Sequence, residues 1–274
     1  MRYTKMHGAG NSFLLTENLR GELQGEDLSV LARRLCREET GPGADGLIVL
    51  LPADDADLGM LFFNADGSLG EMCGNGARCL ARYGVERGLA PDPEHIRIRT
   101  TAGPVLGRRI SRELYQIRLN DPSVIERREV PLDGKRIPCT YVELGNPGIP
   151  HAITEVPAEA LAAADTLRPL GRALRHSPAF PKGANITFLC FDGPDSVRAL
   201  TFERGVEDFT LACGTGCGAA AASLFLDGRL TGTSLTVHMP GGTLSISLRP
   251  EGGSVRDLLL TGPTALMETG DFPL

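Results

Sequence analysis

The sequence predicts an α+β fold of two pseudo-symmetric domains. Each is expected to be a mostly antiparallel β-barrel or roll around a central helix, with the active site in the cleft between the two. Three observations predict this fold. The chain of 274 residues repeats itself at a nearly constant offset. Short apolar runs bounded by Gly and Pro, which are typical of strands, dominate both halves. Each half also holds one helical segment rich in small residues, which favour close packing of that helix among strands.

The duplication is clearest at two Cys-Gly-x-Gly turns, residues 73–76 and 213–216, which begin 140 residues apart. A repeat of this length indicates two copies of one structural unit. Further landmarks recur in the same order: residues 43–50 with 183–190, Asn64 with Glu203, Gly103 with Gly242, and Ala9-Gly10-Asn11 with Leu144-Gly145-Asn146. The length suits two domains. We expect one domain over residues 1–117, joined by the C-terminal segment 263–274, and the other over residues 118–262.

The predicted elements follow the apolar pattern along the chain. Strands are expected at Gly46–Leu51, Leu58–Phe63, Ile96–Thr100, Tyr115–Leu119, Ile186–Phe191, Ser196–Phe202, Leu235–Met239 and Thr243–Leu248. Helices are expected at Leu28–Arg37, Ala77–Arg87, Ala158–Leu161, Pro169–His176 and Gly218–Leu226. The helices that follow the two cysteine turns are the expected central helices, because they are the richest in small residues.

Composition excludes several classes of partner. The net charge is −6, so we expect no nucleic-acid partner. No apolar run reaches the roughly 20 residues of a membrane helix, and the N-terminus lacks an apolar signal segment. Seven cysteines without such a signal predict reduced thiols and a cytoplasmic protein. Cys36, Cys139 and Cys190 are interpreted as small buried side chains.

The two cysteine turns predict acid–base chemistry by thiols. The N-terminus of a helix carries unpaired N–H groups and a partial positive charge, which lower a thiol pKa and bind anions. The backbone N–H groups of Gly74 and Asn75, and of Gly214 and Thr215, could therefore clamp one carboxylate. Thiols on opposite faces of the neighbouring carbon could then invert an amino acid, one removing the α-proton and the other delivering a proton.

Other chemistries match the residues less well. The spacings of Cys73 with Cys79 and of Cys213 with Cys217 do not suit zinc, and the glycine-rich turns lack the Lys of a phosphate loop. We therefore expect no metal. No lysine lies in a recognisable pyridoxal phosphate setting, so no cofactor is expected. A redox pair between Cys73 and Cys213, or purely structural thiols at both turns, remain alternatives.

The chain resembles the diaminopimelate epimerase family of racemases, which work without pyridoxal phosphate. The resemblance covers nearly the whole chain and rests on the following strings: Lys5-Met6-His7-Gly8-Ala9-Gly10-Asn11, Asn64-Ala65-Asp66-Gly67-Ser68, Cys73-Gly74-Asn75-Gly76-Ala77-Arg78, Glu203-Arg204-Gly205-Val206, Ala212-Cys213-Gly214-Thr215-Gly216 and Leu260-Thr261-Gly262-Pro263. It implies a homodimer in which Cys73 and Cys213 are the acid–base pair. It also implies that Asn11, Asn64, Asn185 and Arg204 hold the distal end of the substrate, with Arg204 on its carboxylate. Glu203 would accept from the α-ammonium, and His151 would lie close to the cysteines.

Three departures from the family pattern concern the substrate. Ser12 stands where an Asp is common, and Phe209 lies in a stretch where an acid is common. In Gly145-Asn146-Pro147-Gly148-Ile149-Pro150-His151, either a loop is longer by three residues or Ile149 occupies the position of a substrate-binding Asn. These changes leave the thiol chemistry intact.

The function hypothesis is an isomerase that interconverts LL- and meso-diaminopimelate for lysine and cell-wall synthesis. The alternative within this class is a racemase of another amino acid, such as histidine or lysine, with the same thiol pair. The rival from another class is a non-catalytic amino-acid-binding or thiol redox protein. Exchange of the α-proton with solvent distinguishes the three.

Overall fold

The computed structural model describes residues 1–70, 72–145 and 148–274, and the chain divides into two compact units. Unit 1 comprises Met1–Arg118 with Thr261–Leu274, and unit 2 comprises Leu119–Leu260. Both are rich in strands and contain few helices, as the α+β prediction requires. Each unit is described separately below.

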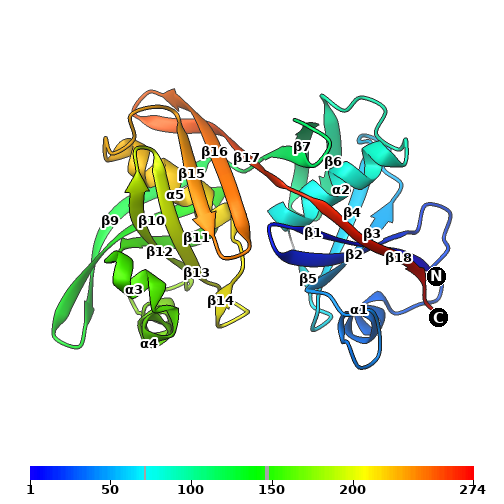
Figure 1. Cartoon of the computed structure of the whole chain (residues 1–274), viewed down its shortest axis with the longest axis horizontal. Helices are drawn as coiled ribbons and strands as arrows, with labels where there is room; N and C mark the ends of the chain where they lie inside the picture. Colours follow the sequence, from blue (N-terminus) through cyan, green and yellow to red (C-terminus); the bar gives the residue numbers. More distant parts are fainter. Residues whose placement is uncertain (71, 146–147) are drawn as a thin grey trace. The chain divides into compact units, whose positions relative to one another are not determined.

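Unit 1 is a curved sheet around the helix α2. Its elements are β1 (Arg2–Gly8), β2 (Asn11–Glu17), α1 (Leu28–Cys36), β3 (Gly46–Leu51), β4 (Leu58–Asn64), β5 (Leu69–Gly70), α2 (Gly74–Glu86), β6 (Ile96–Thr100), β7 (Gly103–Arg109), β8 (Leu114–Arg118) and β18 (Ala265–Asp271). The strands pair in the order β18-β1-β2-β3-β4-β6-β7-β8, with β2–β3 and β4–β6 parallel and the other pairs antiparallel. Strands β1, β2, β4, β6, β7 and β8 all contact α2, so the helix lies inside the sheet (Figure 1).

Unit 2 repeats this plan around the helix α5. Its elements are β9 (Pro122–Leu132), β10 (Lys135–Gly145), β11 (Gly148–Glu155), α3 (Ala158–Ala162), α4 (Ala164–Arg175), β12 (Asn185–Gly193), β13 (Ser196–Phe202), β14 (Phe209–Thr210), α5 (Gly214–Leu226), β15 (Ser234–Met239) and β16 (Gly242–Glu251). Strand β17 (Ser254–Pro263) runs across the boundary between the units. The order is β9-β10-β11-β12-β13-β15-β16, again with two parallel pairs, β11–β12 and β13–β15.

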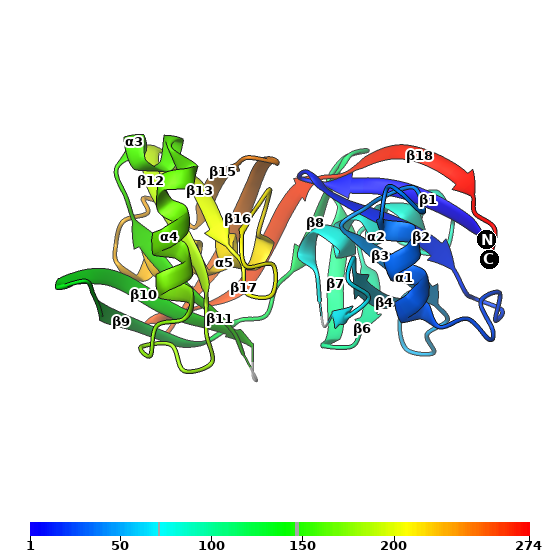
Figure 2. The same ribbon diagram turned by 90° about the horizontal axis from the view of Figure 1, so that it is seen from below.

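Both central helices are largely buried, and in α5 the small residues from Gly214 to Ser223 allow the surrounding strands to approach closely. In α5, a Cβ on Gly214 would lie 2.5 Å from Leu260 Cδ2, and a Cβ on Gly218 would lie 2.7 Å from Leu119 Cδ1. The outer helices cover the opposite face of each sheet: α1 packs on β3 and β4, and α4 on β12 and β13 (Figure 2). Asp27 caps α1 by accepting from the N–H groups of Ser29 and Val30 at 3.0 and 3.1 Å. Each sheet therefore has one face toward its central helix and one toward its outer helices.

Strand register shows which residues of the two units are equivalent. Phe13 lies opposite Gly46 in the parallel pair of unit 1, and His151 lies opposite Asn185 in that of unit 2. Asn11 lies two residues before Phe13 on the same face of its strand, and Ile149 lies two residues before His151. Asn11 pairs with Gly8 of the preceding strand, and Ile149 pairs with Leu144. The register therefore matches Asn11 with Ile149 and replaces the sequence-based match of Asn11 with Asn146.

The hairpin that precedes His151 is regular. Strands β10 and β11 pair as far as Gly145 opposite Gly148. Asn146 and Pro147 lie outside the described residues. Ile149 is therefore a strand residue two positions before His151. The match of Ile149 with Asn11 places an apolar side chain in unit 2 where unit 1 has an amide.

Candidate active site

The first cysteine turn lies at the N-terminus of α2. Cys73 is the N-cap residue, with extended backbone angles of φ −129° and ψ 113°. Its carbonyl accepts the Ala77 N–H at 2.8 Å, and its Sγ accepts the Gly76 N–H at 3.5 Å. The thiol is partly exposed. An N–H donor and the positive end of a helix both favour a thiolate, so this position suits a base.

Two predicted binding residues of unit 1 form one network beside this turn. Asn75 Nδ2 donates to Asn11 Oδ1 at 2.6 Å, and Arg78 Nη2 donates to Asn75 Oδ1 at 2.8 Å. Arg78 is fully buried and also donates to the Gly74 carbonyl at 3.4 Å. The buried guanidinium therefore holds the Asn75 amide, which in turn orients Asn11. These contacts bring Asn11, Gly74 and Asn75 together with Cys73.

Asn64 is placed on the same face of the sheet by register. It ends β4 opposite Gly46, which lies opposite Phe13. Paired strand residues share a face, so Asn64 and Asn11 both lie on the side that faces α2. The Asn64 amide Nδ2 donates to Ser68 Oγ at 2.9 Å in the β4–β5 turn. Ser12 lies on the other face, where its N–H and hydroxyl bind Asp45 Oδ2 at 2.7 and 3.1 Å.

The second cysteine turn lies at the N-terminus of α5, in a different environment. Cys213 is the N-cap residue, with φ −124° and ψ 100°, and its side chain is buried. Thr215 Oγ1 lies 3.6 Å from its Sγ. Burial, and next the Glu203 carboxylate, raise the pKa of Cys213 well above its usual value, although Thr215 and the Gly216 N–H act in the opposite direction. This thiol therefore suits an acid.

Glu203 connects the second turn to the end of β13. It follows Phe202, the last residue of that strand. Its carboxylate accepts from Thr210 Oγ1 at 2.7 Å and from the Cys213 thiol. Burial raises the pKa of Glu203, and these two hydrogen bonds oppose the rise. The carboxylate therefore reaches the thiol directly.

Asn185 and Arg204 are joined through the backbone. Asn185 Oδ1 accepts the Arg204 N–H at 2.8 Å, which fixes the loop after β13. The Arg204 side chain is exposed, and its Nη1 donates to the Lys182 carbonyl at 3.3 Å. Lys182 Nζ lies 3.1 and 3.2 Å from the two carboxylate oxygens of Glu143, a residue only 7% exposed. The guanidinium is thus presented outward from an anchored loop.

His151 is fully buried on β11, directly opposite Asn185. Neither ring nitrogen has a hydrogen-bond partner among the residues that the structure describes. Burial, and next the positive charge of Arg204, lower the pKa of His151 to about 3. The imidazole is therefore neutral at neutral pH. It lies in the same row of strand ends as Asn185, on the face toward α5.

Sequence reasoning missed two features behind the second turn. Thr187 and Thr201 are fully buried, and their hydroxyls lie 3.0 Å apart. A Cβ on Gly216 would lie 2.9 and 3.1 Å from these hydroxyls and 3.3 Å from Cys213 Sγ. Strand alternation was the available signal, since Thr187 lies two residues after Asn185 and Thr201 two before Glu203. The second missed feature is the Met239 thioether, 3.3 Å from the Cys213 nitrogen.

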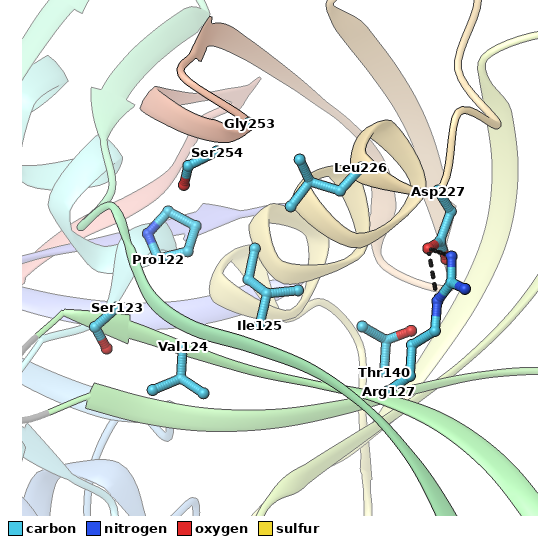
Figure 3. Close-up of a pocket in the computed structure, with 10 residues that line it drawn as sticks. All are labelled: Pro122, Ser123, Val124, Ile125, Arg127, Thr140, Leu226, Asp227, Gly253 and Ser254. Carbon is cyan, nitrogen blue, oxygen red and sulfur yellow. Dashed lines mark hydrogen bonds and ion pairs between the residues drawn. The ribbon is translucent and has the colours of Figure 1, made fainter.

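Other candidate sites are remote from this chemistry or absent from the described chain. A cavity of about 400 Å³ is lined by residues that include Leu226, Asp227 and Arg127 (Figure 3). It lies at the C-terminal end of α5, about 20 Å from Cys213 by the rise of a 13-residue helix. Within residues 1–70, 72–145 and 148–274, no group of three His, Cys, Asp or Glu side chains could hold a metal ion. No helix in that part of the chain is long and apolar enough to span a membrane.

Comparison with known proteins gives one consistent result. The diaminopimelate epimerase family model matches residues 3–109 and 143–266. Diaminopimelate epimerase of Moorella thermoacetica is 38% identical over 291 residues, which cover 100% of both chains. The Methanothrix thermoacetophila enzyme of the same name is 39% identical over 266 residues, 92% of this chain and 90% of the relative.

Solved structures share the fold at low identity. A probable proline racemase from Agrobacterium radiobacter superposes with a TM-score of 0.76 at 20% identity, covering 100% of this chain and 93% of that one. A PhzF-family phenazine biosynthesis protein from Bacillus anthracis superposes with a TM-score of 0.78 at 14% identity, covering 100% and 99%. These likenesses establish the two-domain, barrel-like α+β fold.

Proposed function

We propose that this chain, which belongs to the diaminopimelate epimerase family, interconverts LL- and meso-diaminopimelate without a cofactor. The observation that carries the proposal is the pair of equivalent N-cap thiols, Cys73 on α2 and Cys213 on α5. Family membership makes the chain an isomerase of the racemase and epimerase type.

The proposed chemistry is a proton transfer at one carbon. One thiolate removes the α-proton, and the electron pair of the C–H bond passes into the neighbouring carboxylate. The other thiol then gives its proton to the opposite face of the carbon, so that the centre is inverted and the thiolate and thiol exchange places. The N–H groups of Gly74, Asn75, Gly214 and Thr215 would hold the carboxylate, whose charge grows in the transition state.

The surroundings of the two thiols suggest which is ionised first. Cys213 is buried beside the Glu203 carboxylate, which favours its protonated form. Cys73 is partly exposed and accepts the Gly76 N–H, which favours its thiolate. We therefore assign Cys73 as the base and Cys213 as the acid in the resting enzyme. Glu203 would accept from the α-ammonium of the substrate, and that positive charge would ease the ionisation of Cys213 in the reverse reaction.

The remaining predicted residues would recognise the distal end of the substrate. Arg204 offers an exposed guanidinium from an anchored loop, suited to bidentate binding of a carboxylate. Asn11, Asn64 and Asn185 would supply amide groups. His151 would serve as a neutral accessory group, because its buried ring has two nitrogens without partners among the described residues.

We also propose a cytoplasmic homodimer that serves lysine and peptidoglycan precursor synthesis. Strand β18 supports the dimer, because its side chains face solvent along most of its length and include Leu266 and Met267, which are 50% and 52% exposed. Seven reduced cysteines support the cytoplasm. Sedimentation of the purified chain tests the dimer.

Exchange of the α-proton in heavy water tests the function. Wild-type protein incubated with LL- or meso-diaminopimelate should incorporate deuterium at the α-carbon, followed by nuclear magnetic resonance, and yield the other stereoisomer. The variants C73A and C213A should lose this interconversion, while C190A, which removes a buried thiol from the outer core of unit 2, should keep it. Exchange with histidine or lysine but none with diaminopimelate would overturn the substrate assignment.

A further inference from the structure

A two-residue turn joins β6 to β7 in unit 1 and β15 to β16 in unit 2. The residue that ends the strand before this turn differs between the two units. Thr100 lies opposite Gly103 in unit 1, and Met239 lies opposite Gly242 in unit 2, so the two residues are equivalent. The Thr100 hydroxyl stays within its own turn, donating to the Gly103 carbonyl at 2.8 Å and accepting the Ala102 N–H at 3.2 Å. The Met239 thioether leaves its turn and reaches another segment.

The sulfur of Met239 contacts the second cysteine turn at two places. Its Sδ accepts the Cys213 N–H at 3.3 Å and the Cys217 S–H at 3.5 Å. The same turn donates the Gly241 N–H to the Leu211 carbonyl at 2.8 Å. Met239 is only 7% exposed, so these contacts are shielded from water.

These contacts fix Cys213 on both sides of its α-carbon. The Cys213 carbonyl accepts the Cys217 N–H at 3.0 Å, and its own N–H donates to Met239. With both peptide groups held, the backbone angles that direct the thiol are set. A thioether is a weak acceptor without charge. The Met239 sulfur therefore accepts the buried Cys213 N–H without adding a negative charge near the thiol. The negative charge of Glu203 already disfavours the Cys213 thiolate.

We propose that Met239 is a positioning residue that aims the Cys213 thiol. The arrangement is confined to the second turn, because Ala77 stands in unit 1 where Cys217 stands in unit 2, and Thr100 stands where Met239 does. The catalytic consequence rests on the proposed thiol chemistry. The geometric consequence, a restrained Cys213, does not depend on it.

The variant M239L tests the proposal, because leucine keeps the volume and removes the acceptor; such swaps are usually well tolerated in cores. We expect kcat/KM for diaminopimelate to fall about tenfold, as for the loss of one hydrogen bond near reacting groups. Alkylation of Cys213 by iodoacetamide, followed by peptide mass spectrometry, should become several-fold faster because the turn is less restrained. M239Q, whose amide oxygen can accept the Cys213 N–H, should restore the slow alkylation.

Two internal controls make the outcome decisive. The alkylation rates of Cys73 and of the buried Cys190 should not change in M239L, and T100V, the matched variant of unit 1, should leave Cys213 alkylation unchanged. A purely structural role is indicated if all buried cysteines react faster together, and that result overturns the proposal. The proposal is also overturned if M239L has kcat/KM within twofold of wild type and an unchanged rate of Cys213 alkylation. If the wild-type protein fails to act on diaminopimelate, the proposed function falls, while the alkylation arms still decide the role of Met239.

Discussion

Replacing Gly216 by alanine probes the packing behind Cys213. The backbone of Gly216 has no positive φ, so alanine is sterically permitted by the chain itself. Its Cβ, however, would lie 2.9 Å from Thr187 Oγ1, 3.1 Å from Thr201 Oγ1 and 3.3 Å from Cys213 Sγ. The substitution would therefore separate a fully buried hydroxyl pair and press on the thiol.

The magnitude follows from three contributions. Alanine is favoured over glycine in a helix by about 1 kcal/mol. Overpacking a core costs about 1–3 kcal/mol, and disturbing a buried hydrogen bond costs about 1–3 kcal/mol more. The net expectation for G216A is a loss of about 1–5 kcal/mol, centred near 3 kcal/mol, which corresponds to a fall in Tm of about 6–12 °C at the centre of that range. The activity should fall as well, because the thiol is displaced.

The equivalent position in unit 1 provides a matched control. A Cβ on Gly76 would meet Ile48 Cδ1 at 2.9 Å and Met60 Cε at 3.4 Å, which are the ends of flexible side chains. The helix preference then offsets most of the cost, and G76A should change stability by less than about 1 kcal/mol. Thermal and urea unfolding of both variants measure the difference. The reasoning is refuted if G216A is as stable as wild type, or if G76A is the more damaging change.

Three further predictions concern substrate binding and pH. E143Q weakens the ion pair with Lys182, whose carbonyl accepts from Arg204, so the segment that holds the Arg204 side chain should loosen. Steady-state kinetics should then show KM for diaminopimelate several-fold higher with little change in kcat. An unchanged KM would contradict this link. R204K should lower kcat/KM, with a rise of about 2 kcal/mol in the activation free energy, because lysine cannot bind a carboxylate bidentately. Kinetics equal to those of wild type would remove Arg204 from the site. Burial raises the pKa of Cys139 from 9.0 to about 11, so its thiol ionises earlier in the unfolded chain, and stability is kept below pH 9 and lost as pH rises toward 11. Over that range the urea midpoint of wild type should fall by more than that of C139V, and parallel pH curves would refute the assignment.

Strands bounded by Gly or Pro could be predicted closely from the sequence. β3, β6 and β13 have the predicted bounds, because their apolar runs end at residues that favour turns. The long strands β9 and β10 were not predicted. They carry charged and polar side chains along exposed faces, as in the burial pattern of β9, and only pairing with a neighbour reveals them as strands.

The helices show where local preference yields to tertiary packing. The two central helices were predicted from Ala77 and Gly218, but they begin at Gly74 and Gly214. Glycine has a low intrinsic helix preference, so the sequence predicted a later start for both helices. In the structure these glycines are buried against the surrounding strands, and the helices include them. Helix α4 begins at Ala164 and continues through Pro169, where the sequence predicted a start. Its buried residues Leu167 and Leu174 keep the helix on β12 and β13 across the proline.

The sequence by itself determined the two equivalent turns. A cysteine before Gly-x-Gly at the start of a helix specifies an N-cap thiol with open backbone N–H groups, and this depends only on residues adjacent in the chain. Only the tertiary structure decided how the two thiols differ. A local N–H lies beside each thiol, but Cys73 stays partly exposed whereas Cys213 is buried against Glu203 and Met239, which the ends of other strands supply. Ionisation depends on burial and on neighbouring charge, and both are set by which strands the fold brings to each turn.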